Sequence, residues 1–318
     1  MSAYGCKHFG KTISFYQSYI KSCSTNAKGI VFGSDINCIS TDNFKNKYDE
    51  ALSSLSKGVI PDCCKNCFEL KENYTPDENI KFETFYISNW LHCNAACIYC
   101  AYKQIKTEPV SNRVKKSSAY DILPILQKIS NLNLLADSPR VFITGGEPSL
   151  LQELPDIIDF FKQHNAHFFQ IYSSGIKYNK SIHDLLKSET STELIVSPDS
   201  GTKELYKKIK TVDKFDDFIK NIKHYLEDIN QKNKIISKYI CIKNVNDNEK
   251  DISEWIFAMK NIGIKNIRID IDYNWNDTPT KNHTDIYRLF NFAEQKAKNE
   301  GLNLSITEMA KQNAILSE

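Results

Sequence analysis

The sequence predicts an α/β protein in which a partial (β/α)6 barrel follows a small, cysteine-rich, metal-binding domain. From residue 81 onward, short apolar or alternating runs typical of strands alternate with segments whose apolar residues recur at helical spacing. Such repeats imply parallel strands with right-handed crossovers, and about six of them are too few to close an eight-unit barrel. Before residue 76 the chain instead carries six of its ten cysteines and few periodic apolar positions.

Each β-α unit of the barrel can be located by its apolar pattern. Strands are predicted at 81–88, 141–144, 167–172, 194–197, 234–242 and 267–271, with a last short strand at 302–306. Helices are predicted at 121–130, 154–161, 215–229, 252–259 and 286–293. Pro124 fits the first of these helices only in its first turn, where a missing N–H group removes no helical hydrogen bond.

The N-terminal part of the chain is predicted to be a domain of its own. The expected limits are 1–75 for this domain, 81–308 for the barrel and 309–318 for a C-terminal tail. Within the first domain, a hairpin is expected from 12–16 and 18–20, a further strand at 29–32 and a helix at 48–55. A segment with so few periodic apolar residues is expected to bury little apolar area by itself. A metal cluster bound by its cysteines would supply the additional free energy of folding.

Composition narrows the class of protein and its partners. Of 318 residues, 25% are charged and 41% hydrophobic, which is ordinary for a globular protein in water. The net charge of +2 argues against nucleic acid as a partner. No apolar run approaches the roughly 18 residues of a membrane helix, and the N-terminus lacks the apolar core of a secretory signal. We therefore expect a cytoplasmic protein whose ten cysteines serve metal or Fe–S ligation rather than disulfides.

Three cysteines follow the first predicted barrel strand, in the segment HCNAACIYC, with the spacing Cys93-x3-Cys97-x2-Cys100. Three thiolates on one loop can hold three irons of a cubane [4Fe–4S] cluster. No fourth cysteine follows in the loop, so one iron would stay open for a substrate or cofactor. The alternative is a zinc knuckle, with His92 as the fourth ligand.

This triplet, with Tyr99 just before its last cysteine, resembles the signature of the radical S-adenosylmethionine (radical SAM) superfamily, over roughly residues 81–308. The resemblance implies that Cys93, Cys97 and Cys100 ligate the [4Fe–4S] cluster. It also implies that the open iron is chelated by the amino and carboxylate groups of SAM, and that Tyr99 lies near the adenine of SAM.

Further segments resemble the family's motifs in their usual order. Thr144-Gly145-Gly146-Glu147-Pro148 is similar to the GGE motif, in which Gly145 and Gly146 allow a ligand to approach the backbone and Glu147 offers a carboxylate to the ammonium group of SAM. The remaining residues implied to bind SAM end the third and fourth strands: Ser173, Ser174, Ser197 and Asp199. For the two serines after the third strand, a polar turn without a ligand is an equal alternative.

The fifth predicted strand leaves open which of its faces lines the barrel. If one face does, Lys238 could pair with the carboxylate of SAM. If the other does, Ser237, Tyr239 and Cys241 line the barrel, and Cys241 becomes a candidate hydrogen donor, although a lone buried cysteine usually serves packing. On the sixth strand, charged residues alternate with isoleucines and suggest a polar lumen that contacts substrate: Arg268, Asp270 and Asp272.

The N-terminal cysteines resemble the auxiliary-cluster pattern, called SPASM or twitch, of many radical SAM enzymes, although that pattern usually follows the barrel. Four thiolates suffice for a second [4Fe–4S] cluster. The favoured ligands are Cys6, Cys23, Cys64 and Cys67, with Cys38 and Cys63 as rivals. A structural zinc site with the same thiolates is the alternative.

The resemblance implies an enzyme that cleaves SAM reductively to a 5′-deoxyadenosyl radical, which then abstracts hydrogen from a substrate. The auxiliary-cluster pattern favours a peptide or protein substrate. A small molecule, such as a sugar or surface-polymer precursor, is the runner-up, and RNA comes third. The implied electron donor is a reductant such as flavodoxin or ferredoxin. A non-enzymatic Fe–S or zinc binding protein is the hypothesis from another class, and the ordered GGEP motif and β-α repeats argue against it.

Overall fold

The computed structural model describes most of the chain and divides it into two compact units. The described residues are 4–6, 8–23, 29–33, 36–62, 64–65, 67, 70–73, 80–100, 120–272, 275, 286–307 and 310. The first unit comprises Met1–Leu91, Ser117–Gly146 and Leu151–Phe169. The second comprises His92–Lys116, Glu147–Leu150 and Gln170–Glu318.

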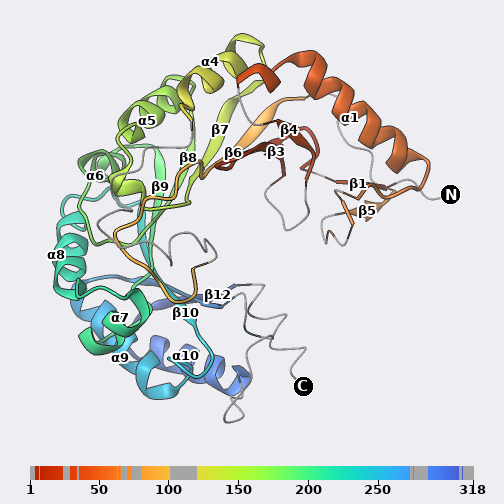
Figure 1. The fold of residues 1–318 in the computed structure, drawn as a ribbon. Coiled ribbons are helices and arrows are strands. Elements are labelled where there is room, and N and C mark those ends of the chain that lie inside the picture. Colours follow the sequence, from red (N-terminus) through yellow and green to blue (C-terminus); the bar gives the residue numbers. More distant parts are fainter. Residues whose placement is uncertain are drawn as a thin grey trace. The chain divides into compact units, whose positions relative to one another are not determined.

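In the residues that the structure describes, the first unit is a mixed sheet with helices α1, α4 and α5 (Figure 1). Its main strands follow the order β4-β3-β2-β6-β7, and a separate antiparallel pair joins β1 to β5. These strands are β1 (Tyr4–Gly5), β2 (Thr12–Phe15), β3 (Ile20–Ser22), β4 (Val31–Gly33), β5 (Lys71–Glu72), β6 (Phe82–Ile87) and β7 (Leu135–Ile143). The helices are α1 (Thr41–Ser56), α4 (Leu123–Asn131) and α5 (Leu154–Gln163), with short 3-10 turns η1 (Ile36–Cys38) and, in the second unit, η2 (Pro148–Leu150).

The predicted N-terminal hairpin is present, since β2 and β3 pair in antiparallel fashion with Phe15 opposite Ile20. Strand β2 also pairs in parallel with β6, so that Phe15 lies opposite Ile87. All three side chains are fully buried. The compact units thus follow a different division from the predicted domain limits at 75 and 81, and those limits stay a prediction.

Helix α1 begins seven residues earlier than the apolar pattern predicts, because its first two turns are mostly polar. Ser40 caps the helix, and its Oγ accepts a hydrogen bond from the N–H of Asn43 at 3.1 Å. The buried stripe then continues at helical spacing, through Phe44, Tyr48, Ala51 and Leu55. Pro124 lies in the first turn of α4, as expected.

The second unit alternates strands and helices, and the strand order is β8-β9-β10-β11-β12. β9 to β12 pair in parallel. The strands are β8 (Phe168–Ser173), whose first two residues belong to the first unit, β9 (Ser191–Val196), β10 (Lys234–Cys241), β11 (Asn266–Ile271) and β12 (Asn303–Ile306). The helices are α6 (Lys180–Lys187), α7 (Lys203–Lys210), α8 (Phe215–Tyr225), α9 (Glu249–Ile262) and α10 (Ile286–Asn299). The predicted α/β class with parallel strands is confirmed.

Two of these helices, α6 and α7, escaped prediction because each has only eight residues, too few to establish a helical period. No helix among the described residues is both long and apolar enough to cross a membrane.

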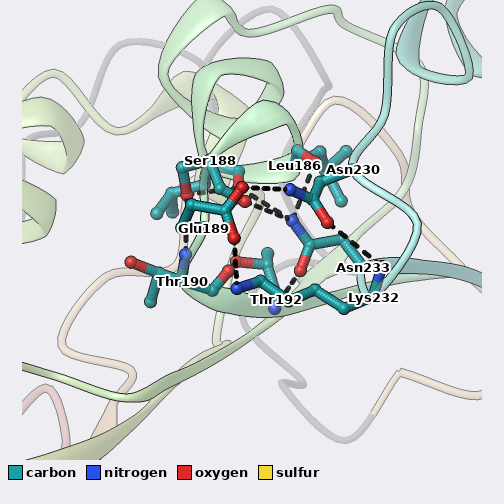
Figure 2. A network of polar contacts seen from close by, with 9 residues as sticks. Leu186, Ser188, Glu189, Thr190, Thr192, Asn230, Lys232 and Asn233 are labelled. Atoms are coloured by element: carbon teal, nitrogen blue, oxygen red, sulfur yellow. Dashed lines mark hydrogen bonds and ion pairs between the residues drawn. The ribbon is translucent and has the colours of Figure 1, made fainter.

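A buried amide fixes the edge of the second unit where β9 and β10 begin (Figure 2). The Nδ2 of Asn233 donates to the carbonyl groups of Leu186 at 2.8 Å and Ser188 at 3.0 Å, and its Oδ1 accepts from the N–H of Thr192 at 2.9 Å. The last carbonyl groups of a helix have no partner within the helix. Asn233 therefore ends α6 and ties it to both strands.

Candidate cofactor and metal sites

The cysteine loop of the second unit is held by the C-terminal end of α7. The N–H of Ala96 donates to the carbonyl of Lys210, and the N–H of Ile98 donates to the carbonyl of Ile209, both at 3.0 Å. The hydroxyl of Thr211 donates to the carbonyl of Ala96 at 3.1 Å. These contacts use the carbonyl groups that the end of a helix leaves unpaired, so the helix and the loop complete each other.

The three thiols of this loop are all half-buried. Burial, followed by the charges of Glu147 and Cys97, raises the pKa of the Cys93 thiol. Among the residues that the structure describes, no three His, Cys, Asp or Glu side chains come close enough to share one metal ion. A cubane cluster binds each thiolate through a different iron, so the donor set of Cys93, Cys97 and Cys100 suits three irons of such a cluster.

The two glycines of the predicted GGE motif end β7 in the first unit. Gly145 has a φ of +104°, and a Cβ there would lie 3.1 Å from the Cα of Ser88 and from the carbonyl oxygen of Trp90. The N–H of Gly146 donates to the same carbonyl at 3.1 Å. Glycine is thus required at 145 by its backbone conformation and by the close approach of residues 88–90.

Glu147 is buried in the second unit and gathers the residues after β8. Its Oε1 accepts from the hydroxyl of Ser173 at 2.7 Å and from the N–H of Ser149 at 3.0 Å. Its Oε2 accepts from the N–H of Ser174 at 2.6 Å, and the Ser174 hydroxyl donates to Asn94 of the cysteine loop at 2.9 Å. A carboxylate offers about four acceptor positions. The three predicted residues Glu147, Ser173 and Ser174 therefore lie together, while their contact with SAM stays a prediction.

Asp199, in the loop after β9, is fully buried and engages Tyr99. Its Oδ2 accepts from the Tyr99 hydroxyl at 2.6 Å and from the Nζ of Lys210 at 2.5 Å. Its Oδ1 accepts from the N–H of Ile240 at 2.8 Å, and Asn246 binds its carbonyl at 3.1 Å. Tyr99 and Asp199, which the resemblance assigned to SAM separately, are thus hydrogen-bonded to each other. Lys210 was missed, because a lysine on a short helix rich in lysines predicts a solvated face.

The segment around Asp199 is also fixed by its glycine. A Cβ at Gly201 would lie 2.1 Å from the backbone carbonyl group of Glu254 in α9, so no other residue fits there without moving the helix. Ser197 lies half-buried directly after the end of β9. Its predicted contact with SAM stays a prediction.

The structure decides which face of β10 packs against a helix. The indole N–H of Trp255 in α9 donates to the Ser237 hydroxyl at 3.0 Å, and the rings of Tyr239 and Trp255 lie 4.9 Å apart. Cys241 lies on the same face, is fully buried, and burial raises the pKa of its thiol. This environment is typical of a packing cysteine, and the role of Cys241 as hydrogen donor stays a prediction.

The opposite face of β10 carries Lys238. Its Nζ lies 2.9 Å from the Oδ2 of Asp270 on β11, whose Oδ1 accepts from the hydroxyl of Thr307 at 2.7 Å. In the parallel register Lys238 lies beside Arg268. The predicted polar face therefore exists and contains both signs of charge. Lys238 is paired with Asp270, and its contact with SAM stays a prediction.

The N-terminal cysteines favoured as ligands meet in one pocket of the first unit. Ten residues line it: Cys6, His8, Phe9, Ser22, Cys23, Gly29, Ile30, Cys64, Cys67 and Leu70. Cys38 belongs to η1 instead, where a Cβ on Gly33 would lie 2.5 Å from the Cys38 Cβ. Cys63 lies outside the described residues. The fold therefore brings the four favoured cysteines to one pocket, while their role as ligands stays a prediction.

Comparison with known proteins places these features in a family. The sequence profile of the radical SAM superfamily matches residues 90–256. A GTP 3′,8-cyclase of Haemophilus influenzae (strain 86-028NP) is 26% identical over 158 residues, which cover 49% of this chain and 44% of that enzyme. A probable GTP 3′,8-cyclase of Saccharolobus islandicus is 30% identical over 135 residues, 42% of this chain and 41% of that protein. The matched region spans less than half the length of these relatives.

Among solved structures, SuiB of Streptococcus suis bound to its precursor peptide SuiA resembles this chain with a TM-score of 0.54 at 14% identity. The likeness covers 86% of this chain and 56% of SuiB. SuiB bound to S-adenosylmethionine gives a TM-score of 0.53 at 15% identity, over 85% of this chain and 57% of that one. Identity this low shows a shared fold and no more, and it confirms the predicted partial barrel.

Proposed function

Because this chain belongs to the radical SAM superfamily, we propose that it cleaves SAM reductively at a [4Fe–4S] cluster held by Cys93, Cys97 and Cys100. The protein is a radical SAM enzyme, and the family implies both cofactors. The observation that carries the proposal is the cysteine loop, whose amides on both sides of Cys97 are fixed by the end of α7. Held by these three thiolates, the cluster and SAM would supply one-electron reduction and radical hydrogen abstraction from a substrate.

The residues of the chain itself position these groups. The three thiolates are the iron ligands. The segment has no fourth cysteine, which leaves one iron open for SAM. The Glu147 carboxylate fixes Ser173 and Ser174 and has capacity for one further donor, which suits the ammonium group of SAM. A buried site of this kind excludes water from a reactive radical. A reductant such as flavodoxin or ferredoxin would deliver the electron.

The first candidate substrate is a peptide or protein, and the second group of cysteines supports it. A pocket lined by Cys6, Cys23, Cys64 and Cys67 suits a second [4Fe–4S] cluster, which takes four thiolates. An auxiliary cluster could take up the electron left on an oxidised peptide. The fold is one that, in SuiB, binds a precursor peptide.

The second candidate substrate is a small molecule. The relatives with 26–30% identity are named as GTP 3′,8-cyclases, and the polar face with Lys238, Arg268 and Asp270 could bind a charged small molecule. A sugar or surface-polymer precursor would carry similar polar groups.

The test of the reaction is release of 5′-deoxyadenosine. Anaerobically reconstituted protein with SAM and dithionite should form it, and the Cys97→Ala variant should not. Release that is equal in both proteins would refute the proposed cluster site. Adding peptides encoded beside the gene, or GTP and nucleotide sugars, should then identify the substrate class by a rise in 5′-deoxyadenosine above the uncoupled rate.

A further inference from the structure

A buried ion pair lies directly behind the cysteine loop. The side chains of Lys210 and Asp199 are 2% and 0% exposed, and their charged atoms are 2.5 Å apart. The Nζ of Lys210 also donates to the Tyr99 hydroxyl at 2.7 Å. Buried lysines are rare and costly unless fully paired. Asp199 is the partner that makes burial of the Lys210 charge possible, and the cost of burying the pair suggests that it has a function.

The ion pair reaches the loop through Tyr99. The ammonium of Lys210 lies 5.0 Å from the centre of the Tyr99 ring, in addition to its contact with the hydroxyl. Burial, then the charges of Asp199 and Cys97, raise the pKa of Tyr99. The Tyr99 hydroxyl therefore contacts both members of the ion pair, and Tyr99 itself lies in the loop between Cys97 and Cys100.

The backbone places Lys210 at the same point. Its carbonyl binds the N–H of Ala96, and the carbonyl of Ile209 binds the N–H of Ile98, so the two contacts flank Cys97. Burial lowers the pKa of Lys210, but the charges of Asp199 and then Cys97 outweigh burial and hold the pKa above its ordinary value. A single residue thus supplies backbone support beside Cys97 and a buried positive charge at Tyr99 of the same loop.

We propose that Lys210 is a positioning residue for the cluster: its carbonyl anchors the loop beside Cys97, and its buried charge raises the reduction potential of the bound [4Fe–4S] cluster. A nearby positive charge favours the reduced, more negative state of a cluster. This inference rests on the proposed cluster at Cys93, Cys97 and Cys100.

The test is a redox titration of the reconstituted full-length protein, followed by electron paramagnetic resonance. The signal to follow is the one that changes when SAM is added, because that signal belongs to the triplet. Its loss in Cys97→Ala identifies it independently, so a failure of the proposed cluster site is distinguished from a failure of the present inference.

Lys210→Met removes the charge and keeps the length of the side chain. We expect a lower potential by at least a tenfold change in the one-electron equilibrium, equal to 59 mV, and faster iron loss to a chelator. Asp199→Asn should shift the potential in the opposite direction, because it removes the negative partner. Lys207→Met, on the exposed side of the same helix, is the matched control and should leave the potential unchanged.

Opposite signs for the two variants cannot come from loosened packing alone, which would affect both variants alike. An unchanged potential in Lys210→Met, or shifts of the same sign in both variants, would overturn the proposal. If Lys210→Met does not fold, Tyr99→Phe keeps both charges and removes only the hydroxyl that accepts from Lys210 and donates to Asp199, which loosens the position of the ammonium. It should lower the potential by a smaller amount, and no shift in that variant would also count against the proposal.

Discussion

The two groups of cysteines differ in how their positions are fixed. Cys93, Cys97 and Cys100 lie within one eight-residue segment, and hydrogen bonds from α7 hold that segment in place. Cys6, Cys23 and the Cys64–Cys67 pair come from three separate segments and line one pocket. The protein's own hydrogen bonds fix the first group, whereas we predict that the second group depends on a bound metal to hold its segments together. The following predictions test this difference, beginning with the largest effect.

Replacing Cys93, Cys97 and Cys100 together with Ala should abolish SAM cleavage and remove about half of roughly eight irons per chain, because two cubane clusters are expected. Iron and sulfide analysis of the anaerobically reconstituted protein measures this. The fold should survive, since α7 and β9 keep their other contacts. Four irons with one zinc in the unaltered protein would contradict the second cluster.

Replacing Cys64 and Cys67 together with Ala should remove the second cluster and leave SAM cleavage with a strong reductant intact. Protease cleavage should increase before residue 75, because few apolar contacts secure those loops, while 81–308 should stay protected. Mass spectrometry of limited digests locates the cuts. Cleavage spread evenly along the chain would show that both parts unfold together and that the predicted domain limit is misplaced.

Changing Glu147 to Gln should weaken SAM binding by about 1.5–3 kcal/mol, the usual loss for a charged hydrogen-bond acceptor, and leave the cluster spectrum unchanged. Equilibrium dialysis with labelled SAM gives the affinity. Glu189→Gln is the matched control, because the Glu189 carboxylate is exposed and lies just before the start of β9, whereas the predicted SAM residue Ser197 follows its end. Equal SAM affinities in the unaltered protein, Glu147→Gln and Glu189→Gln would show that Glu147 does not bind SAM.

Asn233→Ala should lower the free energy of unfolding by about 2–3 kcal/mol, because buried carbonyl and N–H groups lose their partner. Iron content and SAM cleavage should not change, which separates general stability from metal binding. Urea denaturation measures the loss. Lys232→Ala, which breaks only an exposed ion pair, should stay within about 0.5 kcal/mol of the unaltered protein.

Local patterns carried most of what could be predicted. The barrel strands and larger helices follow apolar periods, and the cysteine triplet and GGEP lie within short segments. The face of β10 could not be predicted, because a strand's period does not say which side a helix covers, and Trp255 settles it. Lys210 could not be predicted either, since Tyr99 lies 111 residues away along the chain, and nothing in the sequence shows that the loop of Asp199 turns back onto the end of α7.

The contact between the cysteine loop and α7 has a consequence for the order of folding. Tyr99 and Lys210 are separated by 111 residues, and α7 has only eight residues, too few to be stable by itself. At about 5–20 residues per second, the ribosome needs roughly 6–20 s to make the chain between them. During that time the three thiols are already made, but the α7 carbonyl groups that hold the loop on both sides of Cys97 are not. We therefore expect the proposed cluster to assemble after α7 has been translated, and the thiols to be most open to oxidation before then.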